Sequence, residues 1–519
     1  LSDFINEYEF NPSRKLLLKQ IRKGKIKFVS DITLDKNEPK KFNYIINGSV
    51  IDTKINLLNK FKADKVKFDF LIDKDAFKLK KTELIIDKIP ISSDEIKITK
   101  LNDQFEIKGN LKTKKTKINF ENYNKIINKD LTNLFNQPIN LSSDNTLSFK
   151  LKNKFEINEL KLISKINFDS LYTNSKFQDL IYLKNGDIVI NYDEKELRLD
   201  LDSKFLFKNE KYNNYKSNNE FKLLYKKKQN LNASIDIDLT NTKNKVKAKE
   251  FKKFISFENF NFPEQDISFA SENKIKFDLN NNNHIKNLTV KSKLKTDNIL
   301  INYKSLRIKK YLKNFKNQVK LTQSDFNIDY KNNNFKINLI SKYLINDIEE
   351  KITLNLEKDN TNYFFDLNLD LDSADIQIRE IDYKKKVDIK SNLYIKGKYK
   401  NNKEIIFEKF QFNEEDKKLL IENLELSKND KIKNLDLFKI DIINKNGKEN
   451  KLEFKKVNNN YYLTGSQFDG SKNIKNLLDS SSKSIFSNFK NLNTYIYLDI
   501  GKYFVEKFSY LSNVKGEIQ

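Results

Sequence analysis

The sequence predicts a mainly β protein, a long continuous antiparallel β-meander curled into an elongated groove, with a few short helices. Three observations lead to this fold class. Apolar and polar residues alternate with period two along nearly the whole chain, and short turns rich in Asn, Asp and Lys separate the alternating runs. Helical spacing appears in only a few places, so a series of βαβ units is not expected.

The alternation indicates strands with one apolar and one polar face. In residues 65–72, four apolar side chains fall on one face, and lysine and aspartate fall on the other. The same pattern recurs in "ASIDIDLT" and "NKIKFDLN". The candidate residues for the apolar face in these three strands are Val66, Phe68, Phe70, Ile72, Ile235, Ile237, Leu239, Ile275, Phe277 and Leu279.

The elements are expected in six segments. They are an N-terminal helical segment at 1–24, a first part of the groove at 25–120, a short helix at 121–138, a second part of the groove at 139–470, a short helix at 471–490, and the start of a further hairpin at 491–519. Pro12 and Gly24 are suitable start and stop signals for the first helix, and the second ends before Pro138. Residues 305–318 fit a strand or a helix.

A weak internal repeat links two of the helical segments. A shift of 348 residues aligns Phe120 with Phe468 and Asn145-Thr146 with Asn493-Thr494. If the repeat holds, each copy is a strand, a short helix and a hairpin inserted in one sheet.

The stretch "YYLTGSQFDGSKNIKNLL" contains two of the chain's 10 glycines. Gly465 is expected at a bulge or a close approach of two backbones. Gly470 is expected where the chain leaves the sheet for a helix, with Asp469 or Ser471 as the cap. The stretch therefore predicts a structural junction, not a phosphate-binding or catalytic loop.

The net charge of +26 would suit nucleic acid or an anionic membrane surface. The basic residues are not clustered, however, and acidic residues lie among them, so solvated strand faces are the favoured interpretation and no nucleic-acid partner is expected. The absence of cysteine excludes disulfides and thiolate sites. No apolar run reaches the roughly 18 residues that span a bilayer. Since the sequence begins at Leu1 and has no Met, we expect a fragment whose membrane anchor lies outside it.

Catalytic residues are hard to find in this sequence. His284 is the only histidine and lies in an Asn-rich turn, "NNNNHIKN". A metal site or a catalytic triad would depend on that residue alone. No nucleophile elbow, P-loop or dinucleotide motif occurs. We therefore expect no enzyme, no metal and no cofactor.

A long sheet with one apolar face needs something to cover that face. We estimate about thirty to forty strands from the typical length of a strand and its turn, and the helices are too few to cover them. The sheet would form separate sandwiches, or a transmembrane barrel, or a trough that holds lipid. Lysines at many alternate positions and the lack of Trp disfavour the barrel.

Three stretches resemble AsmA-like proteins, the family of YhdP and TamB, which are bridge-like lipid transfer proteins of the Gram-negative envelope. They are "NPSRKLLLKQIRKGKIKFVSDITL" at 11–34, the strand series at 42–111 with its small-residue step "NGS", and Leu463-x-Gly465 with Phe468-Asp469-Gly470 before Leu477-Leu478. The resemblance extends over the whole chain in loose motifs.

The resemblance implies a periplasmic β-groove, anchored in the inner membrane, along which phospholipid moves between the two membranes during outer-membrane biogenesis. Acyl chains would contact the apolar face, and outer-membrane or periplasmic proteins would be partners. Each buried CH2 contributes about 0.8 kcal/mol without directional contacts, so lipid would be held firmly and still slide. The alternative is a structural or adhesive surface protein built of β-sandwich repeats, with no lipid cargo. A conduit requires one continuous sheet, whereas a sandwich array requires paired sheets with closed cores.

Overall fold

The computed structural model confirms the predicted meander and its antiparallel pairing. It describes residues 21–34, 42–57, 61–86, 88–101, 104–119, 137–152, 156–172, 181–207, 210–214, 216–251, 260–282, 284–303, 306–312, 315–345, 348–400, 404–428, 431–471 and 494–518. The chain divides into two compact units, residues 1–241 with 274–287 and residues 242–273 with 288–519. Each unit is described by itself below.

Most of the described residues lie in strands. In the first half of the chain these are β1 (Ile21–Leu34), β2 (Phe42–Leu57), β3 (Phe61–Ile72), β4 (Ala76–Ile86), β5 (Ile89–Leu101), β6 (Gln104–Ile118), β7 (Ile139–Lys152), β8 (Ile157–Leu171), β9 (Ile181–Tyr192), β10 (Glu196–Phe207), β11 (Asn219–Lys228), β12 (Ala233–Lys247), β13 (Phe260–Asn261), β14 (Asp266–Leu279) and β15 (Ile285–Tyr303). In the second half they are β16 (Gln318–Lys331), β17 (Asn334–Ile345), β18 (Ile348–Asp359), β19 (Asn362–Asp370), β20 (Ile376–Ile378), β21 (Tyr383–Lys385), β22 (Ser391–Tyr399), β23 (Ile405–Glu414), β24 (Lys417–Leu426), β25 (Ile432–Asn434), β26 (Leu437–Ile443), β27 (Glu449–Val457), β28 (Asn460–Asp469), β29 (Ile496–Phe504) and β30 (Tyr510–Ile518).

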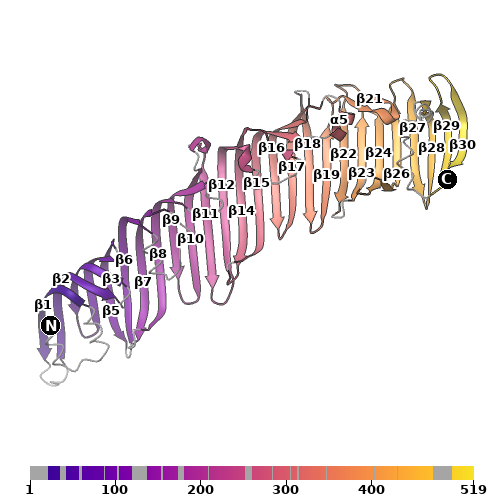
Figure 1. Ribbon diagram of the computed structural model, residues 1–519. Helices are drawn as coiled ribbons and strands as arrows, with labels where there is room; N and C mark the ends of the chain where they lie inside the picture. Colours follow the sequence, from indigo (N-terminus) through magenta and orange to yellow (C-terminus); the bar gives the residue numbers. More distant parts are fainter. Residues whose placement is uncertain are drawn as a thin grey trace. The chain divides into compact units, whose positions relative to one another are not determined.

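Strands that follow one another in sequence are hydrogen-bonded neighbours almost throughout (Figure 1). Twenty-eight strands belong to one sheet, and β20 and β21 form a separate two-stranded sheet. β19 pairs directly with β22, and β24 pairs with both β25 and β26. β28 and β29 are parallel. Among the described strands β1 pairs only with β2, and β30 only with β29, so the sheet is open.

Helices are short and few in the described part of the chain. They are α4 (Ala248–Phe251), α5 (Leu306–Tyr311) and the 3-10 turns η1 (Glu210–Tyr212) and η2 (Arg379–Ile381). Within residues 305–318, which fit either structure, the chain forms α5 and then enters β16 at Gln318.

The predicted N-terminal helix is wrong at its end, because residues 21–24 already belong to β1. A strand of alternating Ile and Lys outweighs the stop signal at Gly24, which adopts a φ of 155° inside the strand. Residues 1–20 lie outside the described residues, as does nearly all of the helices predicted at 121–138 and 471–490. The hairpin expected within 491–519 is present as β29 and β30.

The two copies of the proposed repeat differ in strand direction. β6 and β7, which flank the first copy's helical segment, are antiparallel. β28 and β29, which flank the second, are parallel. The structure therefore does not support an equivalence across the 348-residue shift.

Asn and Asp form many of the turns, as the sequence predicts. Asn332 and Asn333 turn β16 into β17 with φ values of 47° and 71°. In the turn between β3 and β4, Asp73 Oδ1 accepts hydrogen bonds from the backbone N–H groups of Asp75 (2.9 Å) and Ala76 (2.7 Å). Asp193 makes the same pair of bonds in the turn between β9 and β10. Local side-chain bonds of this kind replace the glycines that the chain lacks.

Bulges bend the strands of unit 1 at sites that the sequence does not mark. Three successive strands carry a residue with positive φ, each followed by a buried side chain and accompanied by a shift in register. The pairs are Asp52 and Thr53 in β2, Lys65 and Val66 in β3, and Lys81 and Thr82 in β4. A bulge bends its strand and increases its twist, so the sheet curls here instead of lying flat.

Unit 2 contains a similar bend. Gln323 has a φ of 50° in β16, and the next residue, Ser324, is 1% exposed. Its Oγ lies 2.8 Å from the Oγ of Ser341 on β17, so the two hydroxyls satisfy each other inside the bend.

Candidate functional site

The apolar face of unit 1 is built from rows of side chains that cross the strands. Residues directly opposite each other in an antiparallel pair point to the same face, so the registers define these rows. The first row runs over β2 to β7 and comprises Ile46, Ile72, Phe77, Ile98, Ile107 and Phe149. Beside it runs a second row of Gly48, Phe70, Leu79, Ile96, Gly109 and Leu147.

The structure places the four candidate residues of β3 on this face. Phe70 belongs to the second row and Ile72 to the first. Phe68 packs edge-on against Phe70, with ring centroids 6.3 Å apart. Val66 lies at the bulge and is 3% exposed, so it is part of the bend rather than an accessible surface.

The six later candidates also share a face. In β12, Ile235 and Ile237 lie opposite Tyr225 and Leu223 of β11, and Leu239 lies opposite Phe221. Between β12 and β14, Lys276 Nζ contacts Asp236 Oδ2 at 3.0 Å. Because that ion pair lies on the polar face, the residues that alternate with it in the two strands point together to the other face. In β14 these are Ile275, Phe277 and Leu279.

Unit 2 has rows of the same kind, formed by residues outside the candidate set predicted from the sequence. One row runs from β17 to β29 and comprises Leu339, Leu354, Leu367, Ile395, Phe410, Ile421, Phe438, Phe454, Leu463 and Leu498. The next row comprises Ile352, Leu369, Leu393, Phe412, Leu419, Ile440, Leu452, Gly465 and Ile500. The register between β22 and β23 shifts after Lys396. Gly397 therefore lies opposite Phe407, and Ile395 lies opposite Phe410.

Most of the apolar side chains in β17 to β19 remain half-buried, although they form a continuous face. Ile352, Leu354 and Leu356 alternate strictly with exposed residues in β18, and none of the three is buried. Leu367 and Leu369 in β19 are half-buried as well. A closed core would bury such side chains more fully.

Aromatic rings lie across glycines at three places, two on the apolar face of unit 1 and one on that of unit 2. Gly48 is opposite Phe70, Gly186 is opposite Phe168, and Gly397 is opposite Phe365. A Cβ on Gly186 would lie 2.1 Å from the tip of the Phe168 ring. The missing side chain lets the ring lie against the neighbouring strand.

The two glycines near the end of the chain have similar roles. A Cβ on Gly465 would lie 2.3 Å from the Lys451 carbonyl oxygen, at a register shift between β27 and β28. This confirms the expected close backbone approach. Gly470 lies under the ring of Tyr503. Asp469 Oδ1 accepts hydrogen bonds from Ser471 N (3.2 Å) and Ser471 Oγ (2.6 Å), and nearly all of the helix predicted to follow lies outside the described residues.

The opposite face is polar and carries many exposed ion pairs. Lys439 and Glu453 are 3.1 Å apart, and Lys342 and Glu349 are 3.0 Å apart, with all four side chains substantially exposed. Pairs of this kind contribute at most about 1 kcal/mol each. The basic residues therefore form a solvated surface and do not converge on one point.

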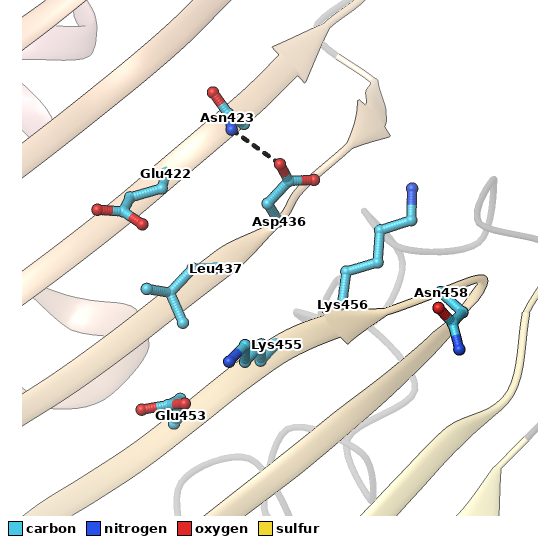
Figure 2. Close-up of a pocket in the computed structure, with 8 residues that line it drawn as sticks. All are labelled: Glu422, Asn423, Asp436, Leu437, Glu453, Lys455, Lys456 and Asn458. Carbon is cyan, nitrogen blue, oxygen red and sulfur yellow. Dashed lines mark hydrogen bonds between the residues drawn. The ribbon is translucent and has the colours of Figure 1, made fainter.

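A pocket of about 580 Å³ lies on this polar side of β24, β26 and β27 (Figure 2). Glu422, Leu437 and Lys455 are cross-strand neighbours there. The residues next to them in sequence, Ile421, Phe438 and Phe454, belong to the apolar row on the opposite face. Asn423 Nδ2 donates to Asp436 Oδ2 at 2.8 Å. Both signs of charge line the pocket, and none of its lining residues belongs to the apolar rows.

One part of the apolar face is covered by the chain itself. Residues 371–390, here called the cap, leave the sheet between β19 and β22 and contain β20, η2 and β21. Its buried residues Leu371, Ala374, Ile376 and Tyr383 form one cluster with residues of β23 to β29. The sheet residues of that cluster are Phe412, Leu419, Ile440, Ile442, Leu452, Phe468 and Ile500.

Two buried charged residues hold the cap in shape. Lys385 is 0% exposed, and its Nζ donates to the carbonyl oxygens of Asp372 (2.7 Å), Ala374 (3.1 Å) and Lys386 (2.9 Å). Burial lowers the pKa of the Lys385 ammonium, an effect that nearby carboxylates, Glu350 first, oppose. On β18, Glu350 accepts hydrogen bonds from the backbone N–H groups of Asp372 (3.0 Å) and Ser373 (2.5 Å).

The described residues offer little for catalysis or metal binding. His284 is exposed in its turn, where its backbone N–H donates to Asn280 Oδ1 at 2.9 Å. No group of three His, Cys, Asp or Glu side chains suitable for a metal ion occurs in the described ranges. None of the described helices is both long and apolar enough to cross a membrane.

Comparison of the chain with protein-family models, curated proteins and solved structures finds no match. The resemblance to AsmA-like proteins therefore stays a prediction from the sequence.

Proposed function

We propose that this protein binds the acyl chains of phospholipid on the apolar face of its sheet and carries lipid along that face, as an AsmA-like component of a bacterial envelope. The proposal places the chain in the periplasm, anchored in the inner membrane by a segment outside this sequence, and gives it no catalytic role. One observation supports it above the others: the continuous rows of apolar side chains are left half-buried in β18 and β19.

The chemistry of the rows suits acyl chains. Leu354, Leu367 and Ile395 are neighbours across three strands, and none of them carries a hydrogen-bonding group. Successive rows lie about 7 Å apart, the distance between alternate residues of a strand. The binding free energy of an acyl chain becomes more favourable by about 25 cal/mol per Å² of apolar surface that leaves water. Little of this free energy is lost when the acyl chain moves to the next strand.

The sandwich alternative required paired sheets with closed cores. In the described residues one sheet holds 28 strands and the other has two, so that architecture does not support an adhesive array. No observation favours adhesion independently.

Native mass spectrometry of the chain, purified without detergent, tests the proposal. We expect phospholipid to co-purify with the protein. In β18, Leu354→Glu places a charge on the apolar face, whereas Asn355→Glu places the same charge on the polar face. The first variant is expected to lose most of the bound lipid and the second to retain it.

Circular dichroism of both variants checks that the sheet still forms. A protein that carries no phospholipid, or two variants with equal lipid content, would contradict the proposal.

A further inference from the structure

We propose that the cap is a lid on the apolar face of unit 2, one that occupies the place of an acyl chain over β23 to β29 and exposes this stretch when it lifts. The inference rests on the proposed function, because it concerns which part of the same face is open to lipid.

The covered and open stretches differ sharply in burial. On β18, Ile352, Leu354 and Leu356 point to this face and are half-buried. On β26 and β27, Ile442 and Leu452 are 3% and 7% exposed. The cap clusters with Leu452 and with its neighbour Ile440, which is 1% exposed. An acyl chain on the open face therefore meets the chain's own residues when it reaches this stretch.

The way the cap joins the sheet lets it move as a unit. β19 and β22 pair directly, up to Asp370 opposite Asn392. Just beyond that pair, the Leu371 N–H donates to the Ser391 carbonyl oxygen at 2.9 Å. The two ends of the cap thus meet at one point of the ladder, and lifting the cap breaks no bond between β19 and β22.

Besides the apolar cluster, a few hydrogen bonds and one ion pair hold the cap to neighbouring segments. Leu312, which follows α5, forms an isolated antiparallel bridge with Ile376. Lys445 donates its backbone N–H to the Asp382 carbonyl oxygen at 3.0 Å, and its Nζ lies 3.5 Å from Asp382 Oδ1. Glu350 holds the turn at the start of the cap.

Buried polar atoms in the cap and beside it are less well satisfied than those of an ordinary core. Several buried oxygens there have no hydrogen-bond partner in the part of the chain that the structure describes. They are Asp375 Oδ1, Gln377 Oε1 and Tyr383 Oη in the cap, and Ser391 Oγ and Glu414 Oε2 at the paired ends of β22 and β23. Water would satisfy these atoms if the cap lifted, which offsets part of the apolar contact that is lost.

A disulfide that locks the cap tests the inference. The chain has no cysteine, so Leu312→Cys with Ile376→Cys introduces the only two thiols. Bridge partners of this kind have Cα atoms about 4.5–5.5 Å apart, within the range that a disulfide spans. The probe is palmitic acid with a diazirine on its acyl chain, and mass spectrometry of peptides maps its adducts.

In the oxidised protein we expect adducts on β18 and β19 and only background on β26 and β27. After reduction, adducts should appear on β26 and β27 as well. Lys385→Met removes the three hydrogen bonds inside the cap. In a protein without the cysteines, this substitution should raise the yield of adducts on β26 and β27 severalfold.

Adducts on β26 and β27 that do not change on reduction, or on Lys385→Met, would overturn the lid while leaving the proposed function in place. A protein without adducts on either pair of strands would overturn both.

Discussion

A ring lying across a glycine recurs on the apolar face, and Gly186 under Phe168 is the tightest of the three strand pairs. We predict that Gly186→Ala lowers the stability of unit 1 by about 1–3 kcal/mol, because the new methyl group overlaps the ring. Gly516→Ala, which has nothing within 4 Å, is the matched control and should change stability by less than about 0.5 kcal/mol. Urea denaturation measures both.

A second substitution tests whether the Phe168 ring causes the loss of stability in Gly186→Ala. In a background of Phe168→Leu, Gly186→Ala should cost less, because the smaller side chain can move aside. A double-mutant cycle with no coupling between positions 168 and 186 would contradict the account.

Backbone N–H groups stabilise the charged carboxylate of Asp73 in the turn between β3 and β4. Its hydrogen bonds from Asp75 and Ala76 lower the pKa of the Asp73 carboxyl below its ordinary value. A lowered pKa means that the charged form stabilises the turn at neutral pH, and that this contribution is lost as the pH falls through the folded-state pKa. Amide exchange at Ala76 should therefore accelerate at acidic pH, after correction for intrinsic rates.

In Asp73→Ala the Ala76 amide should be poorly protected at every pH. If protection in the unmodified protein does not change with pH below 4, the carboxylate is not what holds this turn.

Strands with strict alternation were predictable from the sequence, because side chains with period two assign a face without reference to the rest of the chain. The candidate residues of β3, β12 and β14 accordingly point to the apolar face of the sheet. The cap was not predictable. Its residues Ile376, Gln377 and Ile378 alternate like any other strand, and only the direct pairing of β19 with β22 reveals that they leave the sheet.

The bulges were also invisible in the sequence. Asn and Asp are the non-glycine residues found most often at positive φ, yet Lys65 and Lys81 occupy two of these three positions. The register with the neighbouring strands imposes the conformation, and a single strand carries no sign of it.

The bulge in β3 gives a test with a control in the same strand. Lys65 has a φ of 52°, so Lys65→Gly should be neutral or stabilise the protein by up to about 1 kcal/mol. Lys67 is also exposed but has no positive φ, so Lys67→Gly should destabilise by about 0.5–1 kcal/mol. Equal losses in the two variants, measured by urea denaturation, would show that the bulge carries no strain.

Both units follow the same plan, in which apolar rows cross the strands on one face and exposed ion pairs cover the other. A high content of Lys and Asp is compatible with this plan because every strand presents half of its side chains to water. The net charge of +26 is therefore compatible with a sheet whose polar face is solvated. The function proposed here depends on the apolar face taking up acyl chains.

Site-specific photocrosslinking in β19 tests that claim most directly. Phe364 and Phe365 are adjacent, and their side chains lie on opposite faces of the sheet, since Phe365 is opposite Leu356 and Phe364 opposite Glu357. Each is replaced in turn by p-benzoylphenylalanine, and the full chain is irradiated in the presence of phospholipid vesicles. We predict phospholipid adducts at position 365 and none above background at position 364. Equal labelling at the two positions, or labelling at 364 alone, would contradict the account.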